Sequence, residues 1–248
     1  MRVEAGRRIW VVLPTYNEAE NIAPLVGAIL SLDFGLRVVV VDDASPDGTA
    51  EIARGLARGS PRVHVIRREG ERGLGTAYLA GFRRALDGGA DAVLTMDCDF
   101  SHDPAAIPSL VAALDSARVV IGSRYVAGGR IENWGFYRKL LSATANRFVR
   151  ALFDLPVRDC TSGFRLYRAE VLEGIPWQRV SSTGYSFLAE SLYWAMRQDD
   201  GGARVREVPI CFVDRVRGQS KMGAPEVFSG IINLLRLRVD LFRASNKT

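Results

Sequence analysis

Residues Ala92–His102, AVLTMDCDFSH, place an apolar run directly before two aspartates that are separated by a single residue. The run Ala92–Met96 predicts a buried strand. In an extended segment, residues two apart point the same way, so Asp97 and Asp99 can face one divalent cation. Oxygen ligands suit Mg²⁺ or Mn²⁺, which keep coordination positions open for substrate phosphates. Paired aspartates are also common in surface turns, so the neighbouring segments decide what this pair means.

The same pattern of an apolar run followed by polar residues recurs along the first half of the chain, alternating with amphipathic stretches. This alternation predicts an α/β fold with a mostly parallel sheet covered by helices. The expected strands are Ile9–Leu13, Arg37–Val41, Val63–Ile66, Ala92–Met96 and Arg118–Ile121. The expected helices are Ala19–Ser31, Ala50–Arg58, Gly75–Asp87 and Ala105–Leu114. Open α/β sheets bind ligands where their strands end, so the polar clusters after Val41, Met96 and Ile121 are candidate sites.

The second half is less regular, and we expect amphipathic helices toward its C-terminal end. The predicted elements are a long helix around Trp134–Phe153, a helix at Ser186–Arg197, a strand at Val205–Ile210 and a last helix at Glu226–Phe242. With 248 residues, 48% of them hydrophobic, the chain can bury one core. We therefore expect one domain over residues 1–248, with residues 1–124 and 125–248 as its functional halves.

Charge is divided unevenly between these halves, with a net of −2 over residues 1–124 and +7 over residues 125–248. An acidic half suits a bound cation, and a basic half suits an anionic partner such as phosphate, a lipid surface or nucleic acid. Compositional scatter is the competing explanation. The cysteines Cys98, Cys160 and Cys211 form no CxxC pair and indicate neither a disulfide framework nor a zinc site, so we expect a cytosolic protein.

A second carboxylate cluster follows the expected strand Arg37–Val41 in the sequence DDASPDGT, residues 42–49. A carboxylate buried there needs a hydrogen-bonding partner, from a ligand or from backbone amides. We assign Asp42 to a nucleotide contact, and Asp47 to capping of the next helix. The first strand leads into PTYNE, without a glycine-rich turn, which disfavours a dinucleotide-binding dehydrogenase.

Five segments in this order carry a resemblance: VLPTYNE, VVVDDASPDGT, GLGTAYLAGF, MDCDFSH and IGSRYVAGG. Together they resemble the family 2 glycosyltransferases of the GT-A fold, and most of all the polyprenyl-phosphate (dolichyl-phosphate) mannose synthases. The similarity runs from about Ile9 to Leu241. The resemblance implies that Asp97 and Asp99 bind metal and diphosphate, whereas relatives have Gln or Ser at Ser101, which leaves a metal ligand there open. It implies a nucleotide-sugar site formed by Pro14, Tyr16, Glu18, Asp42, Asp97, Cys98 and Asp99.

Two further segments, DCTSGFR at 159–165 and RVRGQSK at 215–221, resemble signatures of the same family. Arginine, lysine, serine and a flexible glycine are the residue types that a phosphate site needs. Taken singly, each of these cations is expected on a solvated surface; taken together, the signatures favour an acceptor-phosphate site. Its candidate residues are Arg124, Arg138, Ser142, Ser162, Arg215, Ser220 and Lys221.

The expected reaction is transfer of mannose from GDP-mannose to a polyprenyl phosphate, with Mg²⁺ or Mn²⁺ as cofactor and, by resemblance, inversion at the anomeric carbon. A phosphate monoester is largely ionised near pH 7, so it needs no strong general base. We assign catalysis to Asp99, Arg124 and Arg215. Glu190 is interpreted in two ways, as a general base or as a buried structural partner of an arginine.

Membrane contact is expected at Phe136–Phe153, where aromatic and leucine residues alternate with Arg138, Lys139, Arg147 and Arg150. A basic amphipathic helix can lie in a bilayer interface, although an apolar stripe can equally pack on the protein's own core. No apolar stretch is long enough to span a bilayer. We therefore expect a peripheral protein on the cytoplasmic face of a membrane, with a membrane-protein partner as a further candidate for holding it there.

Three other functions compete with this interpretation. The first is a glycosyltransferase that takes a UDP-sugar, such as UDP-glucose, as donor to the same acceptor. The second is a nucleic-acid-binding protein, which the pI of about 9.4 allows, but no basic reading helix or known module is present. The third is a noncatalytic regulator, and the intact Asp97 and Asp99 pair argues against it.

Overall fold

The computed structural model describes residues 6–70, 72–182, 184, 186–198, 204–214, 230 and 232–239. Its main feature is a seven-stranded sheet in the order β3-β2-β1-β4-β7-β5-β8. The strands of this sheet are β1 (Ile9–Thr15), β2 (Arg37–Asp42), β3 (Val63–Arg67), β4 (Ala92–Thr95), β5 (Val119–Ser123), β7 (Arg165–Arg168) and β8 (Val205–Pro209). The predicted strands are confirmed, with ends that shift by one or two residues.

β1 is the centre of the nucleotide-type half of the sheet, because it pairs in parallel with both β2 and β4. Its side chains alternate between the two faces: Trp10 and Val12 belong to one apolar core, and Val11 and Leu13 to the other. A strand buried on both faces reads as a continuous apolar run, which is why the sequence predicted it. Because β1, β2 and β4 run parallel, the polar residues that follow each strand lie at the same edge of the sheet.

β7 was not predicted. It lies between β4 and β5 and pairs antiparallel to both, with Leu166 opposite Leu94 on one side and Val120 on the other. Its first residue, Arg165, is fully buried, and its Nη2 donates to the Cys160 carbonyl at 2.7 Å. The segment predicted to bind phosphate, residues 159–165, overlaps β7 only at Arg165. An arginine predicts an exposed position, whereas Arg165 is buried and donates to backbone carbonyls, so the sequence did not indicate a central strand.

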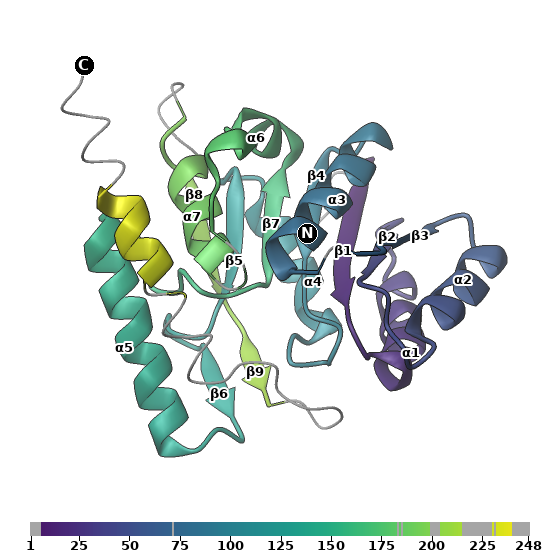
Figure 1. The fold of residues 1–248 in the computed structure, drawn as a ribbon, viewed down its shortest axis with the longest axis horizontal. Helices are drawn as coiled ribbons and strands as arrows, with labels where there is room; N and C mark the ends of the chain where they lie inside the picture. The colour runs from purple at the N-terminus through teal and green to yellow at the C-terminus, as the bar shows by residue number, and fades with distance from the viewer. Residues whose placement is uncertain are drawn as a thin grey trace.

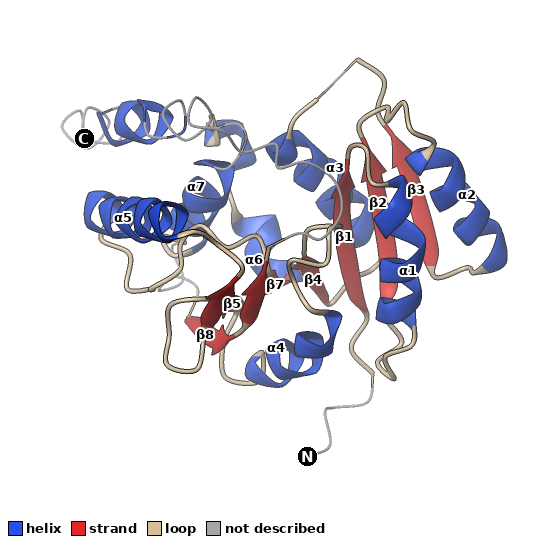
Figure 2. Cartoon of the chain, turned by 90° about the horizontal axis from the view of Figure 1, so that it is seen from below, coloured by secondary structure: helices blue, strands red, loops and turns tan. Residues whose placement is uncertain are grey.

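Helices cover both faces of the sheet (Figure 2). The bounds are α1 (Ala19–Leu30), α2 (Thr49–Gly59), α3 (Leu74–Asp87), α4 (Ile107–Ala113), α5 (Phe136–Phe153), α6 (Ala169–Gly174) and α7 (Ser186–Ala195). Short 3₁₀ turns occur at Pro104–Ala106 and Trp177–Arg179. α1, α2 and α4 contribute to one apolar core, whereas α3, α5, α6 and α7 contribute to the other.

The predicted helix Ala105–Leu114 begins as a 3₁₀ turn, and only Ile107–Ala113 is α-helical. Asp103 accepts a hydrogen bond from the Ala105 backbone N–H and so caps the turn. Pro104 and Pro108 lack a backbone N–H, which is tolerated only near a helix start. The two prolines thus explain why the regular helix is shorter than its apolar pattern.

The second half builds an outer layer on the sheet. α5 lies beside the helical residues 232–239 at one end of the molecule, and a two-stranded sheet of β6 (Arg130–Glu132) and β9 (Cys211–Val213) lies next to it (Figure 1). Leu234 and Leu237 pack into the same core as the buried side of α5. No helix in the described part of the chain has the length and apolarity needed to cross a bilayer.

Candidate active site

A pocket of about 270 Å³ opens where β1, β2 and β4 end. Its wall combines the predicted nucleotide residues with the start of α3. The lining residues are Pro14, Thr15, Tyr16, Glu18, Asp43, Arg72, Gly73, Leu74, Ala77, Asp97, Cys98 and Asp99. Six of the seven residues predicted for the nucleotide-sugar site therefore come together here, and Asp42 is the exception.

Asp97 and Asp99 both face this pocket but differ in their surroundings. The Asp97 side chain is 36% exposed, whereas Asp99 is buried and its Oδ1 accepts the Ser101 backbone N–H at 3.0 Å. The buried Ser101 hydroxyl has no hydrogen-bond partner among the described residues. Two carboxylates and one unpartnered hydroxyl fit Mg²⁺ or Mn²⁺, which bind through one or two carboxylates and complete their shell with water and substrate phosphates.

Asp42 was predicted to contact the nucleotide, but in the structure it is Asp43 that lines the pocket, whereas Asp42 is buried beside it. Asp42 is fully buried and accepts hydrogen bonds from the Thr15 hydroxyl, at 3.1 Å, and from the Ser45 amide and hydroxyl. Its neighbour Asp43 lines the pocket. Successive residues of a strand face opposite ways, and β2 ends at Asp42, so only one of the pair can lie at the pocket wall.

Asp47 ties the ends of two helices together. Its Oδ1 accepts the backbone N–H and the hydroxyl of Thr49, at the start of α2, and its Oδ2 accepts the Ala19 N–H, at the start of α1. Burial works to raise the pKa of the Asp47 carboxyl, but these hydrogen bonds outweigh it and lower that pKa. The N-cap residue of α2 is Gly48, one position after Asp47, but the predicted contact of Asp47 with the start of α2 is confirmed and a second contact reaches the start of α1.

Asp43 fixes the loop that leads into α3. It pairs with Arg68, whose Nε donates to Oδ1 at 2.8 Å, while its Oδ2 accepts the Gly73 N–H at 3.0 Å. Arg68 also donates from Nη2 to the Gly73 carbonyl at 3.2 Å. The clamp holds the backbone beside Arg72, a pocket residue that the sequence analysis missed because it lies in a polar loop without periodicity.

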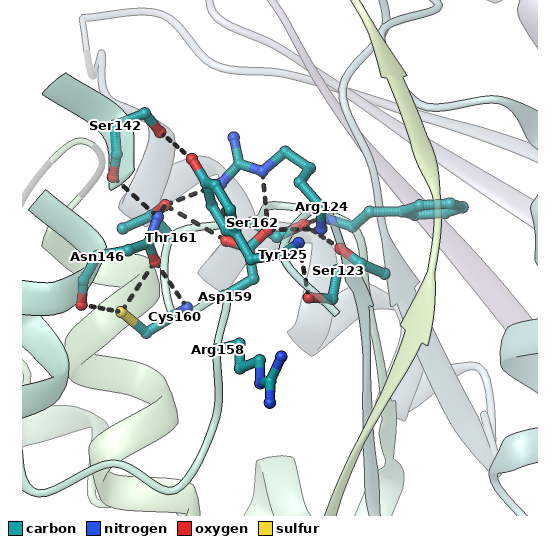
Figure 3. A network of polar contacts seen from close by, with 12 residues as sticks. Ser123, Arg124, Tyr125, Ser142, Asn146, Arg158, Asp159, Cys160, Thr161 and Ser162 are labelled. Carbon is teal, nitrogen blue, oxygen red and sulfur yellow. Dashed lines mark hydrogen bonds and ion pairs between the residues drawn. The ribbon is translucent and has the colours of Figure 1, made fainter. Parts of the chain in front are cut away.

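Arg124, the first predicted acceptor residue, is committed to a buried ion pair (Figure 3). Its Nε and Nη2 donate to the two carboxylate oxygens of Asp159, each at 2.7 Å, and Nη2 also donates to the Thr161 hydroxyl at 2.9 Å. Burial lowers the pKa of Arg124, but the charge of Asp159 outweighs it and raises that pKa; the same pairing lowers the pKa of Asp159.

The network continues into α5 through small polar groups. Tyr125 donates from its hydroxyl to the Ser142 hydroxyl at 2.8 Å, and Asn146 donates from Nδ2 to the Thr161 hydroxyl at 3.0 Å (Figure 3). Ser142 therefore lies in the same cluster as Arg124, and its contact with an acceptor phosphate stays a prediction. Ser162 differs, because its buried hydroxyl donates to the Gly122 carbonyl at 2.7 Å and serves the backbone.

Arg138 lies on the first turns of α5 and remains half-buried. Its Nη1 donates to Asp214 at 2.8 Å, and its guanidinium lies over the Trp134 ring, 4.2 Å from the centroid. Arg124 also lies within 6.0 Å of the Trp134 ring centroid. One aromatic side chain therefore connects the two arginines. The other predicted acceptor residues, Arg215, Ser220 and Lys221, lie outside the described residues.

His102 joins the pocket to the arginine cluster. Its Nδ1 accepts the Asp97 backbone N–H at 3.1 Å, and its ring packs edge-on against Phe212, whose own ring lies 5.4 Å below the Arg124 guanidinium. Burial, which outweighs the nearby Asp99, lowers the pKa of His102 to about 4. The imidazole is therefore neutral near pH 7, and the rings of His102 and Phe212 connect the Asp97 backbone to the Arg124 guanidinium.

Glu190 is buried and holds a loop. Its two carboxylate oxygens accept the backbone N–H groups of Ser181, at 3.1 Å, and Ser182, at 2.7 Å. Of the two interpretations left open, the structural one describes this geometry better, although the partners are backbone amides rather than an arginine.

The model of the family described as "Glycosyl transferase family 2" matches residues 10–175. The chain is 44% identical over 227 residues to polyprenol monophosphomannose synthase of Mycolicibacterium smegmatis, covering 91% of this chain and 84% of that protein. It is 41% identical over 229 residues to undecaprenyl-phosphate mannosyltransferase of Micrococcus luteus, with 92% and 93% covered. Dolichol-phosphate mannosyltransferase of Pyrococcus furiosus is 40% identical over 237 residues, with 93% and 63% covered.

Among solved structures, glucosyl-3-phosphoglycerate synthase from Mycobacterium tuberculosis, crystallised with Mn²⁺, uridine diphosphate and phosphoglyceric acid, matches with a TM-score of 0.68. The match covers 95% of this chain and 80% of that one, at 23% identity. This similarity concerns the fold, and it confirms the predicted GT-A architecture. The family match spans most of the chain, and it includes the strands and loops that form the pocket. The protein is therefore an enzyme that belongs to the family 2 glycosyltransferases.

Proposed function

We propose that this enzyme transfers mannose from GDP-mannose to a polyprenyl phosphate and inverts the anomeric carbon. The observation that carries the proposal is the placing of a carboxylate-lined pocket and an arginine cluster on the two sides of His102. The pocket suits a metal-bound nucleotide-sugar, and the cations suit an acceptor phosphate. The mannosyltransferase names of the relatives support the choice of sugar and of lipid acceptor.

A divalent cation bound by Asp97 and Asp99 would stabilise the negative charge that develops on the departing nucleoside diphosphate. The remaining work falls to the protein's own side chains. Pro14, Tyr16 and Glu18 form the wall against which the nucleoside would bind. The Asp43 clamp fixes the loop before α3, and His102 fixes the backbone at Asp97. The pocket is thus held in shape from two sides.

The acceptor step would rest on positioning and charge. A polyprenyl phosphate is largely ionised near pH 7, so its oxygen can attack without a strong base. Glu190 is already occupied by two backbone amides. Arg138 is half-buried beside Arg124 and can exchange its Asp214 partner for a phosphate oxygen. Arg124 then holds Asp159 and keeps the surrounding loops in place.

A panel of donors tests the proposed reaction. The purified enzyme is incubated with Mn²⁺, a short polyprenyl phosphate and, separately, GDP-mannose, GDP-glucose, UDP-glucose and UDP-galactose. Release of GDP from GDP-mannose alone, stopped by EDTA and restored by excess Mn²⁺, is the expected result. Release of UDP in preference to GDP would refute the donor assignment, and full activity in EDTA would refute the metal.

We further propose that α5 meets the cytoplasmic face of a membrane. Large apolar side chains on this helix are exposed to solvent, with Phe136 at 74% and Tyr137 at 85% exposure, followed by Leu140, Leu141 and Phe148. The buried side of the helix, at Val149 and Phe153, packs on the core. A helix that is apolar on both sides and carries cations between them suits a bilayer interface with anionic lipids.

Liposome sedimentation tests this location. Basic residues near an anionic surface contribute about 1 kcal/mol each, so Arg147→Gln should weaken binding to anionic vesicles about fivefold. Phe136→Ser should also weaken binding, because it removes an exposed apolar side chain. The matched control is Arg54→Gln, an exposed arginine on α2, which should bind like wild type. Equal binding by all variants, or binding that high salt leaves unchanged, would exclude this surface.

A further inference from the structure

The pocket at the ends of β1, β2 and β4, here called the donor pocket, is lined by one cationic side chain among the described residues, that of Arg72. It is exposed, and its guanidinium carbon lies 4.9 Å from the centroid of the ring of Tyr16, which also lines the pocket. No ion pair or hydrogen bond within the described part of the chain occupies its guanidinium, in contrast to Arg68 four residues earlier. Its N–H groups are therefore available at the pocket mouth.

The charge of the pocket gives this position its meaning. Four carboxylates line it, from Glu18, Asp43, Asp97 and Asp99, and Arg68 neutralises one of them, Asp43. A bound divalent cation would offset the charges of Asp97 and Asp99. A nucleotide-sugar carries a diphosphate with two further negative charges, which would face Glu18 without any compensation from the lining except Arg72. Like charges at such distances oppose binding, and a guanidinium removes that opposition.

The backbone delivers this side chain with little freedom. Gly73 is held at both its N–H and its carbonyl, by Asp43 at 3.0 Å and by Arg68 at 3.2 Å. α3 begins at Leu74, directly after this clamp, and its first turn contains no acidic side chain. The positive end of the helix and the Arg72 guanidinium thus meet the pocket from one wall.

We propose that Arg72 is a donor-binding residue that contacts the diphosphate of the nucleotide-sugar. This assignment rests on the proposed function only in requiring a nucleoside diphosphate donor. The 4.9 Å separation from the Tyr16 ring leaves no room for a nucleobase between the two side chains. Arg72 lines the same pocket as Asp97 and Asp99, so a diphosphate whose metal these two carboxylates hold would lie in the cavity that the guanidinium borders.

Calorimetric titrations test the contact. Wild type, Arg72→Met and Arg72→Lys are titrated in Mg²⁺ with a nucleoside, its monophosphate and its diphosphate, in both the guanosine and the uridine series. Loss of a charge-assisted phosphate contact should weaken diphosphate binding by Arg72→Met about tenfold to a hundredfold. Nucleoside binding should be unchanged, the monophosphate should show a smaller loss, and lysine should restore part of the affinity.

The control is Arg67→Met, an arginine on β3 that pairs with Glu51 and Glu69 outside the pocket, which should bind both diphosphates like wild type. Thermal unfolding of Arg72→Met should match wild type, because the side chain is exposed. An equal loss for nucleoside and diphosphate would overturn the assignment, and so would wild-type affinity for the diphosphate. Binding of neither diphosphate by the wild-type enzyme would refute the proposed function along with it.

Discussion

The pocket at the ends of β1 and β4 and the arginine cluster formed by Arg124 and Arg138 differ in how their charged side chains are placed: the aspartates line a cavity, whereas the arginines pair with carboxylates of the protein. In the pocket, Asp97 and Asp99 both line the cavity, and the Asp97 side chain is 36% exposed. In the cluster, Arg124 spends its hydrogen bonds on Asp159 and Arg138 is paired with Asp214. The exposed surface of α5 beside that cluster carries large apolar side chains together with the exposed cations Lys139 and Arg147. The net charge of a segment therefore does not predict which of its side chains contact a ligand, because some of the charged groups are already paired within the protein.

Asp99→Ala should have the largest effect on the rate of transfer. A small effect would show that the carboxylates of the pocket do not act on the ligand as described above. Removing a carboxylate that holds the cation should lower transfer about a thousandfold, since a metal supplies several kcal/mol of stabilisation. Metal-dependent GDP binding should fall in parallel, while circular dichroism remains that of wild type. Asp87→Asn, an exposed aspartate at the far end of α3, is the control and should retain activity. Wild-type turnover by Asp99→Ala would remove Asp99 from the site.

Asp159→Asn should act on stability. It leaves the Arg124 guanidinium buried without its counter-charge, a loss of about 3 kcal/mol in the free energy of unfolding. Because the pKa of Asp159 is lowered in the folded protein, the pair contributes fully at neutral pH and loses its contribution as pH falls through that lowered value. Urea unfolding at several pH values measures both effects.

The matched control for this pair lies at the surface. Arg8 and Asp91 form an ion pair with side chains that are 59% and 41% exposed. Such pairs contribute at most about 1 kcal/mol, so Asp91→Asn should change unfolding little. Similar losses for Asp159→Asn and Asp91→Asn would show that the buried pair is not the structural support described above.

Arg138→Ala sharpens the division between donor and acceptor sides, with the smallest expected effect of the three. With a short polyprenyl phosphate in detergent, its KM for acceptor should rise about tenfold, as expected for one lost charge-assisted contact, while GDP affinity stays unchanged. Lys139→Ala, the exposed neighbour on α5, provides the comparison and should leave both constants unaltered. A fall in GDP affinity in Arg138→Ala would move this arginine to the donor side.

Much of the parallel part of the sheet could be predicted, because strands such as β1 and β2 are buried on both faces and read as unbroken apolar runs. β7 could not, since its buried Arg165 finds partners from Cys160 and Leu188 that only the folded chain brings near. Sequence patterns register apolarity, whereas the burial of a charge depends on distant carbonyls.

For the site, sequence placed Pro14, Tyr16, Asp97 and Asp99 correctly around one pocket, since each follows the end of a predicted strand. It could not separate Asp42 from Asp43, because which of two adjacent aspartates faces the pocket depends on the last paired residue of β2. The sequence did not predict Arg72 as a pocket residue either, because its position depends on the hydrogen bond between Asp43 and the backbone of Gly73, which forms only in the folded chain.

The antiparallel strand β7 constrains the order in which the sheet can form during synthesis of the chain. β1 to β4 follow one another closely in the sequence and can pair as soon as they leave the ribosome. β5, by contrast, does not pair with β4; both strands pair with β7, which follows α5 in the sequence, so β5 can join this sheet only after β7 has been synthesised. Until then the free edge of β4 is a template for pairing with another chain. We therefore expect a nascent chain that ends within α5 to be the one most exposed to aggregation.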